Sequence, residues 1–283
     1  MKHLLIILLL SPGVALANDL ADAITAFDKR EYHEARDKFQ LIAAERGDPD
    51  VLFYLAVSQF RAHQIDAASG TLEKLFKVAP EHVNGHYLEG LLWMAKLNEV
   101  NVFRKVGVAK SALSSWQRVV SIEPENDMGL YAIFSFFFQA PGIAGGDKEE
   151  AAKVLSMLEQ LESPYADMAK ATIANDEEDF EMAEKLFISA TKKISDRGGP
   201  YFALAQFYFQ QERYEDSLEI LDRYELTTQA WHDPDRAMTY FYRGNILTEF
   251  GKPDQARASY QKALSAKPNQ RIRKLTNEAL EAF

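Results

Sequence analysis

The chain has 283 residues and no cysteine, and its 42 acidic and 32 basic residues give a formal net charge of −10. The lack of cysteine excludes a disulfide framework, a thiol nucleophile and a thiolate metal site. The acidic balance argues against nucleic acid as a partner, because phosphate binding needs a concentrated basic face.

The first residues predict a secretory signal peptide over residues 1–17. Lys2 precedes an apolar run, Leu4–Leu10, and small residues then lead to Ala17. An uncleaved membrane anchor is the alternative, but a span needs about 20 apolar residues and Pro12 interrupts the run early. Cleavage would remove one lysine and no acid, leaving 31 basic and 42 acidic residues and a charge of −11. We therefore expect an exported protein, periplasmic or secreted, with no transmembrane segment after cleavage.

The rest of the chain predicts consecutive pairs of helices. In residues 18–49, Leu20, Ile24 and Phe27 recur three or four residues apart, so they share one face of a helix, and a second apolar set follows them. Residues 50–82 repeat this pattern more completely. The pairs and the helix that follows them are expected near residues 18–49, 50–82, 83–126, 127–163, 164–197, 198–235, 237–270 and 271–283.

The third pair is longer than the second. Its small residues Gly90 and Ala112 are twenty-two positions apart, whereas the equivalent residues of the second pair are twelve apart. The ten additional residues fall near 98–106, a segment rich in valine that includes Phe103. One interpretation is that both helices are lengthened by a turn or more, with these side chains packed between them. The other is a protruding apolar lobe that touches a partner.

The fourth pair contains five additional residues, which fall within the eight-residue segment Gln139–Gly146. They predict a rigid wide turn, because proline ends the preceding helix and Asp147 with Glu150 forms a capping box for the next one. The glycines also suit a phosphate-binding loop, but no Gly-Lys-Ser/Thr follows and no strand precedes. A contact with a partner is left open, since another backbone can approach glycine closely.

Two segments in the second half of the chain, one acidic and one amphipathic, have simple structural interpretations. Asp176–Asp179 lacks the glycine and the closing glutamate of a calcium loop, so we expect a solvated turn. Residues 271–283 predict an amphipathic helix that covers the last pair. A helix that binds a membrane or a partner is the alternative for that segment.

Residues 237–270 contain the most complete copy of the pattern. Its defining positions are Tyr240, Gly244, Leu247, Gly251, Ala256, Tyr260, Ala263 and Pro268. This order and spacing resemble a tetratricopeptide repeat. The resemblance implies an all-α fold, a right-handed α-α superhelix of about seven helix pairs with a C-terminal capping helix.

The resemblance also implies where a partner binds. In this family, ligand contacts usually come from the second, fifth, ninth and twelfth positions of each first helix, on a concave face. At the fifth and twelfth positions this chain has Phe53, Phe60, Tyr87, Met94, Tyr131, Phe138, Phe202, Phe209 and Phe241. An aromatic column of this kind suits an extended or helical peptide. Alternatively, the fifth-position rings only fill the space between neighbouring helices.

The sequence predicts no catalytic, cofactor or metal site. There is no Gly-x-Ser-x-Gly motif, and His82 and His86, although one helical turn apart, lack a third ligand and an intervening glutamate. We therefore expect a non-catalytic scaffold or adaptor that binds a protein or peptide in the cell envelope or secreted space. A periplasmic chaperone or carrier that holds extended client segments is the second hypothesis, and an enzyme is the third.

Overall fold

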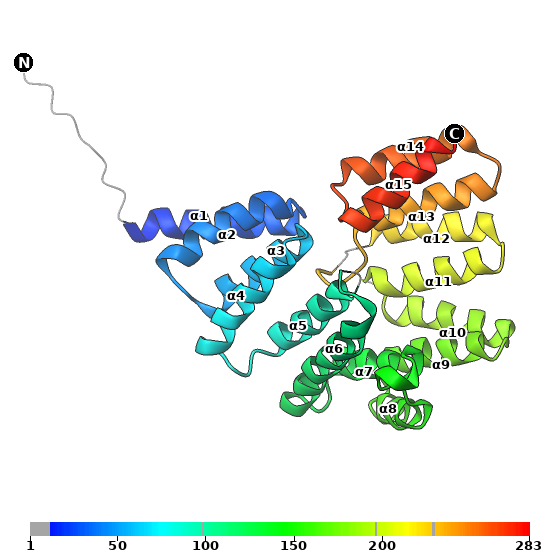
Figure 1. Cartoon of the computed structure of the whole chain (residues 1–283), viewed down its shortest axis with the longest axis horizontal. Coiled ribbons are helices and arrows are strands. Elements are labelled where there is room, and N and C mark those ends of the chain that lie inside the picture. Colours follow the sequence, from blue (N-terminus) through cyan, green and yellow to red (C-terminus); the bar gives the residue numbers. More distant parts are fainter. Residues whose placement is uncertain (1–11, 98, 196, 228–229) are drawn as a thin grey trace, which may run out of the picture. The chain divides into compact units, whose positions relative to one another are not determined.

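The computed structural model describes residues 12–97, 99–195, 197–227 and 230–283. These residues form fifteen α-helices and one short 3-10 helix, η1, with no strand among them (Figure 1). The helices come in consecutive antiparallel pairs, so the predicted all-α repeat fold is confirmed. None of the described helices is long and apolar enough to cross a membrane. The chain divides into two compact units, residues 1–124 and 125–283.

Unit 1 contains three helix pairs. They are α1 (Pro12–Asp28) with α2 (Tyr32–Glu45), α3 (Pro49–Arg61) with α4 (Ile65–Val78), and α5 (Val83–Lys96) with α6 (Val102–Ile122). The second helix of one pair packs on the first helix of the next, as α2 does on α3. In the first of these interfaces Phe39, Ile42, Val51 and Leu55 form a buried cluster. No pair buries its apolar side alone, and stacking supplies the missing cover.

Unit 2 contains four further pairs and a final helix. They are α7 (Asp127–Gln139) with α8 (Lys148–Gln160), α9 (Pro164–Asp176) with α10 (Phe180–Lys193), α11 (Gly198–Gln210) with α12 (Tyr214–Leu226), α13 (Arg236–Glu249) with α14 (Pro253–Ser265), and α15 (Gln270–Glu281). A buried cluster of this unit extends from α9 to α13 and includes Phe187, Phe207, Leu221 and Ile246.

A small residue lets the two helices of a pair approach closely. It is the fourth residue of each second helix except the longer α6, where it lies in the middle. The residues at this position are at most 1% exposed, and they are Ala35, Ala68, Ala112, Ala151, Ala183, Ser217 and Ala256. In the sixth pair the serine hydroxyl donates to the carbonyl of Ala205, 2.7 Å away, so a polar group is accepted at the same buried place.

The ten additional residues of the third pair lengthen only one helix. α6 has 21 residues and α5 has 14. The expectation that both helices are longer is therefore wrong. The expected packing between them is also wrong for Val102 and Phe103, whose side chains are exposed. The apolar pattern of α6 continues past the end of α5. No surface of α5 lies there to bury the side chains of Val102 and Phe103.

The segment between α7 and α8 is a rigid wide turn, as predicted. The amides of Ala144 and Gly146 both donate to the carbonyl of Pro141, through η1 (Gly142–Ala144). A Cβ on Gly146 would lie 2.6 Å from the carbonyl carbon of Ala140, so only glycine fits there. Half of the expected capping box is present, because Asp147 accepts from the amide of Glu150.

The predicted cap helix at the C-terminal end can be compared with the structure, whereas most of the predicted signal peptide cannot. α15 packs on α14 and α13 and buries Ile272 and Thr276, so the interpretation as a cap is confirmed. At the other end, residues 1–11 of the predicted signal peptide lie outside the described residues. α1 begins at Pro12, so the predicted cleavage position after Ala17 falls within a helix. Export remains a prediction.

Candidate functional site

The predicted partner-binding residues of unit 1 differ in exposure. Phe53 is buried, and its ring lies 5.0 Å from that of His82. Phe60 and Tyr87 are half-buried, and Met94 is exposed. Phe53 is therefore mainly a packing residue between α3 and the start of α5. The other three retain surface for a partner.

In unit 2, predicted residues of α7 form a ladder of rings. Tyr131 stacks on Phe134 at 6.3 Å and on Tyr165 of α9 at 5.2 Å, and Phe134 stacks on Phe138 at 5.6 Å. Lys148 lies 4.9 Å above the Phe138 ring. Burial raises the pKa of the Tyr131 phenol, which is hydrogen-bonded to Ser135 and Thr172. Stacked rings with fixed hydroxyls leave few rotamers free, which makes this face rigid.

A second ladder joins α11 to α13. The ring of Tyr242 lies 5.4 Å from Phe202 and 5.9 Å from Phe209, and its hydroxyl accepts from the Gln206 amide at 3.0 Å. Phe202 is buried and Phe209 half-buried. Phe241, predicted at the same face, instead packs on Tyr260 of its own pair at 6.0 Å.

Sequence reasoning missed Tyr165 and Tyr242 because it considered chiefly the fifth and twelfth positions of each first helix. Tyr165 occupies the second position of α9, which the family pattern also names, so a signal for it was available. Tyr242 directly follows a fifth position and contacts the preceding pair. Nothing in the sequence distinguishes it from its neighbour Phe241.

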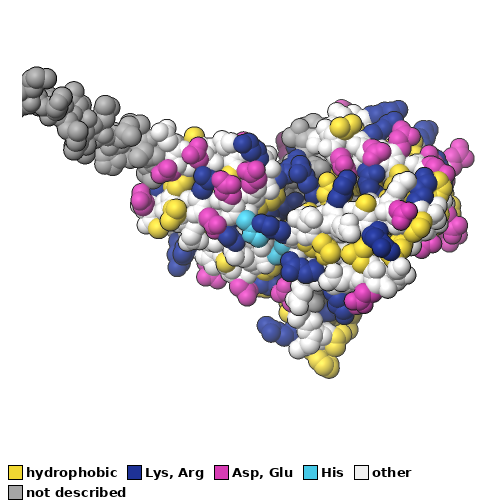
Figure 2. Space-filling model, turned by 90° about the horizontal axis from the view of Figure 1, so that it is seen from above, with side chains coloured by type: hydrophobic (Ala, Val, Ile, Leu, Met, Phe, Trp, Pro, Cys, Tyr) yellow, Lys and Arg dark blue, Asp and Glu magenta, His cyan; other side chains and the backbone are white. Residues whose placement is uncertain are grey.

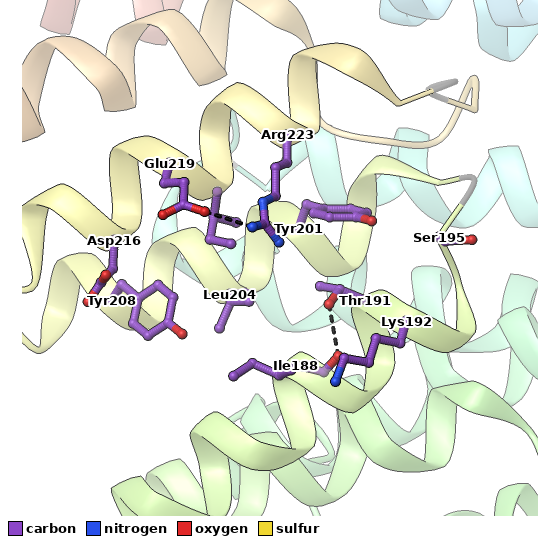
Figure 3. A pocket seen from close by; sticks show the side chains of 11 residues that line it. Ile188, Thr191, Lys192, Ser195, Tyr201, Leu204, Tyr208, Asp216, Glu219 and Arg223 are labelled. Atoms are coloured by element: carbon purple, nitrogen blue, oxygen red, sulfur yellow. Dashed lines mark hydrogen bonds and ion pairs between the residues drawn. The ribbon is translucent and has the colours of Figure 1, made fainter.

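A groove of about 460 Å³ lies between α10 and α12, with α11 as its floor (Figure 3). Ile188 of α10, Leu204 of α11 and Ile220 of α12 give it an apolar base. Its rim is charged: Lys192 comes from α10, and Arg223 on α12 pairs with Glu219 at 2.7 Å. The size and the mixture of apolar base and polar rim suit a short peptide segment better than a metal or a phosphate.

One end of this groove is fixed by a hydrogen-bonded network. Tyr208 donates to Glu184 at 2.9 Å, and Arg213 donates to Glu184 and to Asp216, each at 2.7 Å. The arginine also lies 4.3 Å above the Tyr208 ring. The hydrogen bond from Arg213 lowers the pKa of Glu184, and burial together with the bond to Glu184 raises the pKa of Tyr208 to about 12. At neutral pH the Tyr208 phenol in this network is therefore neutral.

The other polar candidates have structural roles. His82 caps α5 by accepting from the amide of Gly85 at 2.9 Å, and burial lowers its pKa. His86 stacks on Phe76 at 4.3 Å. Asp179 caps α10 through the amide of Met182, as a turn residue would. Within the described ranges, no three His, Asp or Glu side chains are close enough together to hold a metal ion.

Residues 196–269, which contain the second ladder and the α11 and α12 sides of the groove, match the tetratricopeptide repeat family model. This part of the chain is similar to tetratricopeptide repeats. No curated protein matches the chain. Among solved structures, a tetratricopeptide repeat protein from Parabacteroides merdae has a TM-score of 0.55 and 15% identity, over 94% of this chain and 98% of its own.

Human IFIT1, solved as a dimer with PPP-AAAA, is similar to this repeat fold with a TM-score of 0.53 and 16% identity. The alignment covers 87% of this chain and 54% of IFIT1, so this chain spans about half the length of that protein. At these identities the likeness extends to the fold alone. Tetratricopeptide repeats generally serve as protein-binding scaffolds.

Proposed function

We propose that the chain is a non-catalytic scaffold of the cell envelope or secreted space, which binds an extended or helical segment of another protein. The observation that carries the proposal is the pair of aromatic ladders on the first helices of unit 2. Tyr131 with Tyr165, and Phe209 with Tyr242, bring together half-buried rings from consecutive repeats. Half-buried, rigid aromatic surface is the kind that dominates binding energy at protein interfaces, because little side-chain entropy is lost on contact.

Phe138 and Phe209 are the best residues with which to test this function. Both are predicted contact residues and both are half-buried, so alanine removes surface without opening a large cavity. Phe53 and Phe202 are poor choices, since truncation of a buried phenylalanine costs about 3–5 kcal/mol and confuses loss of binding with loss of fold. Leu226 is exposed and lies on α12, a second helix that contributes no ladder residue, which makes Leu226→Ala the matched control.

The experiment is affinity capture from an envelope extract with the wild-type chain, Phe138→Ala with Phe209→Ala, and Leu226→Ala, followed by mass spectrometry. A scaffold should retain one defined partner, lose it in the double variant and keep it in the control. Retention of every partner by the double variant would disprove binding at the ladders. Thermal melts of all three proteins establish that the fold is intact.

A periplasmic chaperone or carrier is the second function that the same surface supports. Its aromatic side chains would hold many extended segments briefly rather than one partner firmly. Capture of many unrelated proteins, all reduced in the double variant, would favour this alternative over the scaffold. An enzyme is the third hypothesis.

A further inference from the structure

The N-terminal end of α6 projects beyond the helix with which it pairs. Gly90 and Trp116 lie at the same level, because the indole fills the space over the glycine. From that level α5 continues for six residues to Lys96, whereas α6 extends back for fourteen residues to Val102. At 1.5 Å per residue, the difference of eight residues places Val102 about 12 Å past the end of α5.

The side chains of this end change from buried to exposed along the helix. Val108 and Ala109 are buried, at the level where α5 ends. Beyond them, Val102 is 69% exposed and Phe103 is 92% exposed, the largest value among the exposed large hydrophobic side chains of the described residues. Soluble surfaces seldom display a phenylalanine with a neighbouring valine at the tip of a projection, so this tip has the character of a contact site.

The charge of α6 is opposite to that of the chain. Between Glu99 and Glu123 there is no acidic residue, and four basic residues occur at Arg104, Lys105, Lys110 and Arg118. The first three are exposed and take part in none of the ion pairs of the described residues. On the face drawn in Figure 2, both acidic and basic side chains are present. The projecting end therefore combines an apolar tip with a basic collar in a chain of net charge −10.

We propose that the projecting end of α6 binds an anionic lipid bilayer. Phe103 and Val102 enter the interfacial layer, and Arg104, Lys105 and Lys110 contact lipid phosphates. A narrow convex tip cannot enclose a peptide as a groove does, but a bilayer deforms around it, and aromatic and long basic side chains are suited to the interface. The basic collar supplies the charge complementarity. An acidic protein surface or a second copy of the chain is the competing occupant.

The test uses a fluorescent probe at the tip. Because the chain contains no cysteine, Val102→Cys in the full-length protein provides one labelling site for an NBD fluorophore and leaves Phe103 in place. Leu226→Cys is the matched control, since Leu226 is 88% exposed but lies in unit 2. Both proteins share the apolar N-terminus, so any membrane binding by that segment contributes equally to both.

Vesicles of phosphatidylcholine with 30% phosphatidylglycerol should raise the NBD emission at position 102 at least twofold and shift it to the blue. Pure phosphatidylcholine should have little effect, and 0.5 M salt should weaken the response. Adding Arg104→Gln and Lys105→Gln should reduce vesicle affinity by about fivefold for each charge removed. Because these residues are exposed, the melting temperature should not change.

Three results would overturn the proposal. One is no response at position 102, and another is an equal response at positions 102 and 226. The third is a rise in NBD emission when unlabelled protein is added without vesicles, which would assign the tip to a second copy of the chain. None of these results bears on the aromatic ladders, so the proposed scaffold function is tested separately.

Discussion

The indole of Trp116 occupies the space above Gly90, where an added Cβ would lie 2.6 Å from Trp116 Cε2. The last pair has the same arrangement, with Tyr260 over Gly244 and a Cβ 2.5 Å from Tyr260 Cδ1. The ring follows the glycine by 26 residues in one pair and by 16 in the other. The difference equals the ten additional residues of the third pair. The insertion therefore lengthens α6 without altering the contact that sets how closely the helices pack.

Gly90→Ala should destabilise unit 1 by about 2 kcal/mol, because the added methyl group overpacks a site already filled by a large rigid ring. Gly70 is the matched control, since it lies inside α4 with no atom near an added Cβ. There the gain in helix propensity should stabilise the protein by about 0.5–1 kcal/mol. Urea unfolding of both variants measures the difference. Equal effects would show that the indole does not constrain position 90.

The helix pairs could be predicted from the sequence because each contains this kind of local complementarity. In every pair a small buried residue lies in the second helix, and in the third and seventh pairs a glycine of the first helix also lies against an aromatic ring of the second. The exposure of Phe103 could not be predicted in the same way. Its apolar spacing continues that of buried residues in α6, and only the length of the partner helix decides whether anything covers it.

The groove and the ladders were harder to predict because their residues come from three consecutive helices or from neighbouring repeats. In the sequence, Ile188, Leu204 and Ile220 have the apolar character of ordinary core positions of their own helices. The partner-binding role of the nine predicted residues is still a prediction. What the structure adds is which of them retain exposed surface, and this decides which variants are informative.

Asp233 supports the start of α11 from the segment between α12 and α13. Its buried carboxylate accepts from the amides of Gly198 and Gly199, at 3.0 and 2.9 Å, and from that of Ala230 at 2.6 Å. Asp233→Ala should therefore destabilise the protein by about 3 kcal/mol, since buried amides lose a charged acceptor. Asp254→Ala, at an exposed position in the first turn of α14, should change stability by less than about 0.5 kcal/mol. Chemical denaturation with both variants checks this.

The Tyr208 hydroxyl should give the network around Glu184 a dependence on alkaline pH. The folded-state pKa of Tyr208 is raised from 10.0 to about 12, so the neutral phenol stabilises the fold below pH 10 and this contribution is lost as the pH rises toward 12. Tyr208→Phe should lower the free energy of unfolding by about 1–2 kcal/mol at pH 8. The gap between variant and wild type should narrow between pH 10 and 12. A gap that is constant over this range would contradict the assignment, and Tyr240→Phe is the control.

The turn inside most pairs contains a residue in the left-handed region two positions before the second helix. These residues are Arg30 (φ 61°), His63 (φ 61°), Glu178 (φ 61°), Glu212 (φ 57°) and Gly251 (φ 70°). Only the last is a glycine, which adopts this conformation without a steric cost, whereas other residues lose about 1 kcal/mol or more. Gly251→Ala should therefore destabilise the protein by about 1 kcal/mol.

Glu178→Gly should act in the opposite direction at the equivalent turn between α9 and α10. Relief of the left-handed strain is partly offset by the greater backbone entropy of glycine in the unfolded chain, so the expected gain is about 0.5 kcal/mol. Thermal unfolding of the two single variants measures both effects, and the two sites are far enough apart in the repeat array for their free energies to add. A loss of stability in Glu178→Gly would mean that the glutamate side chain contributes more to the turn than its backbone conformation costs.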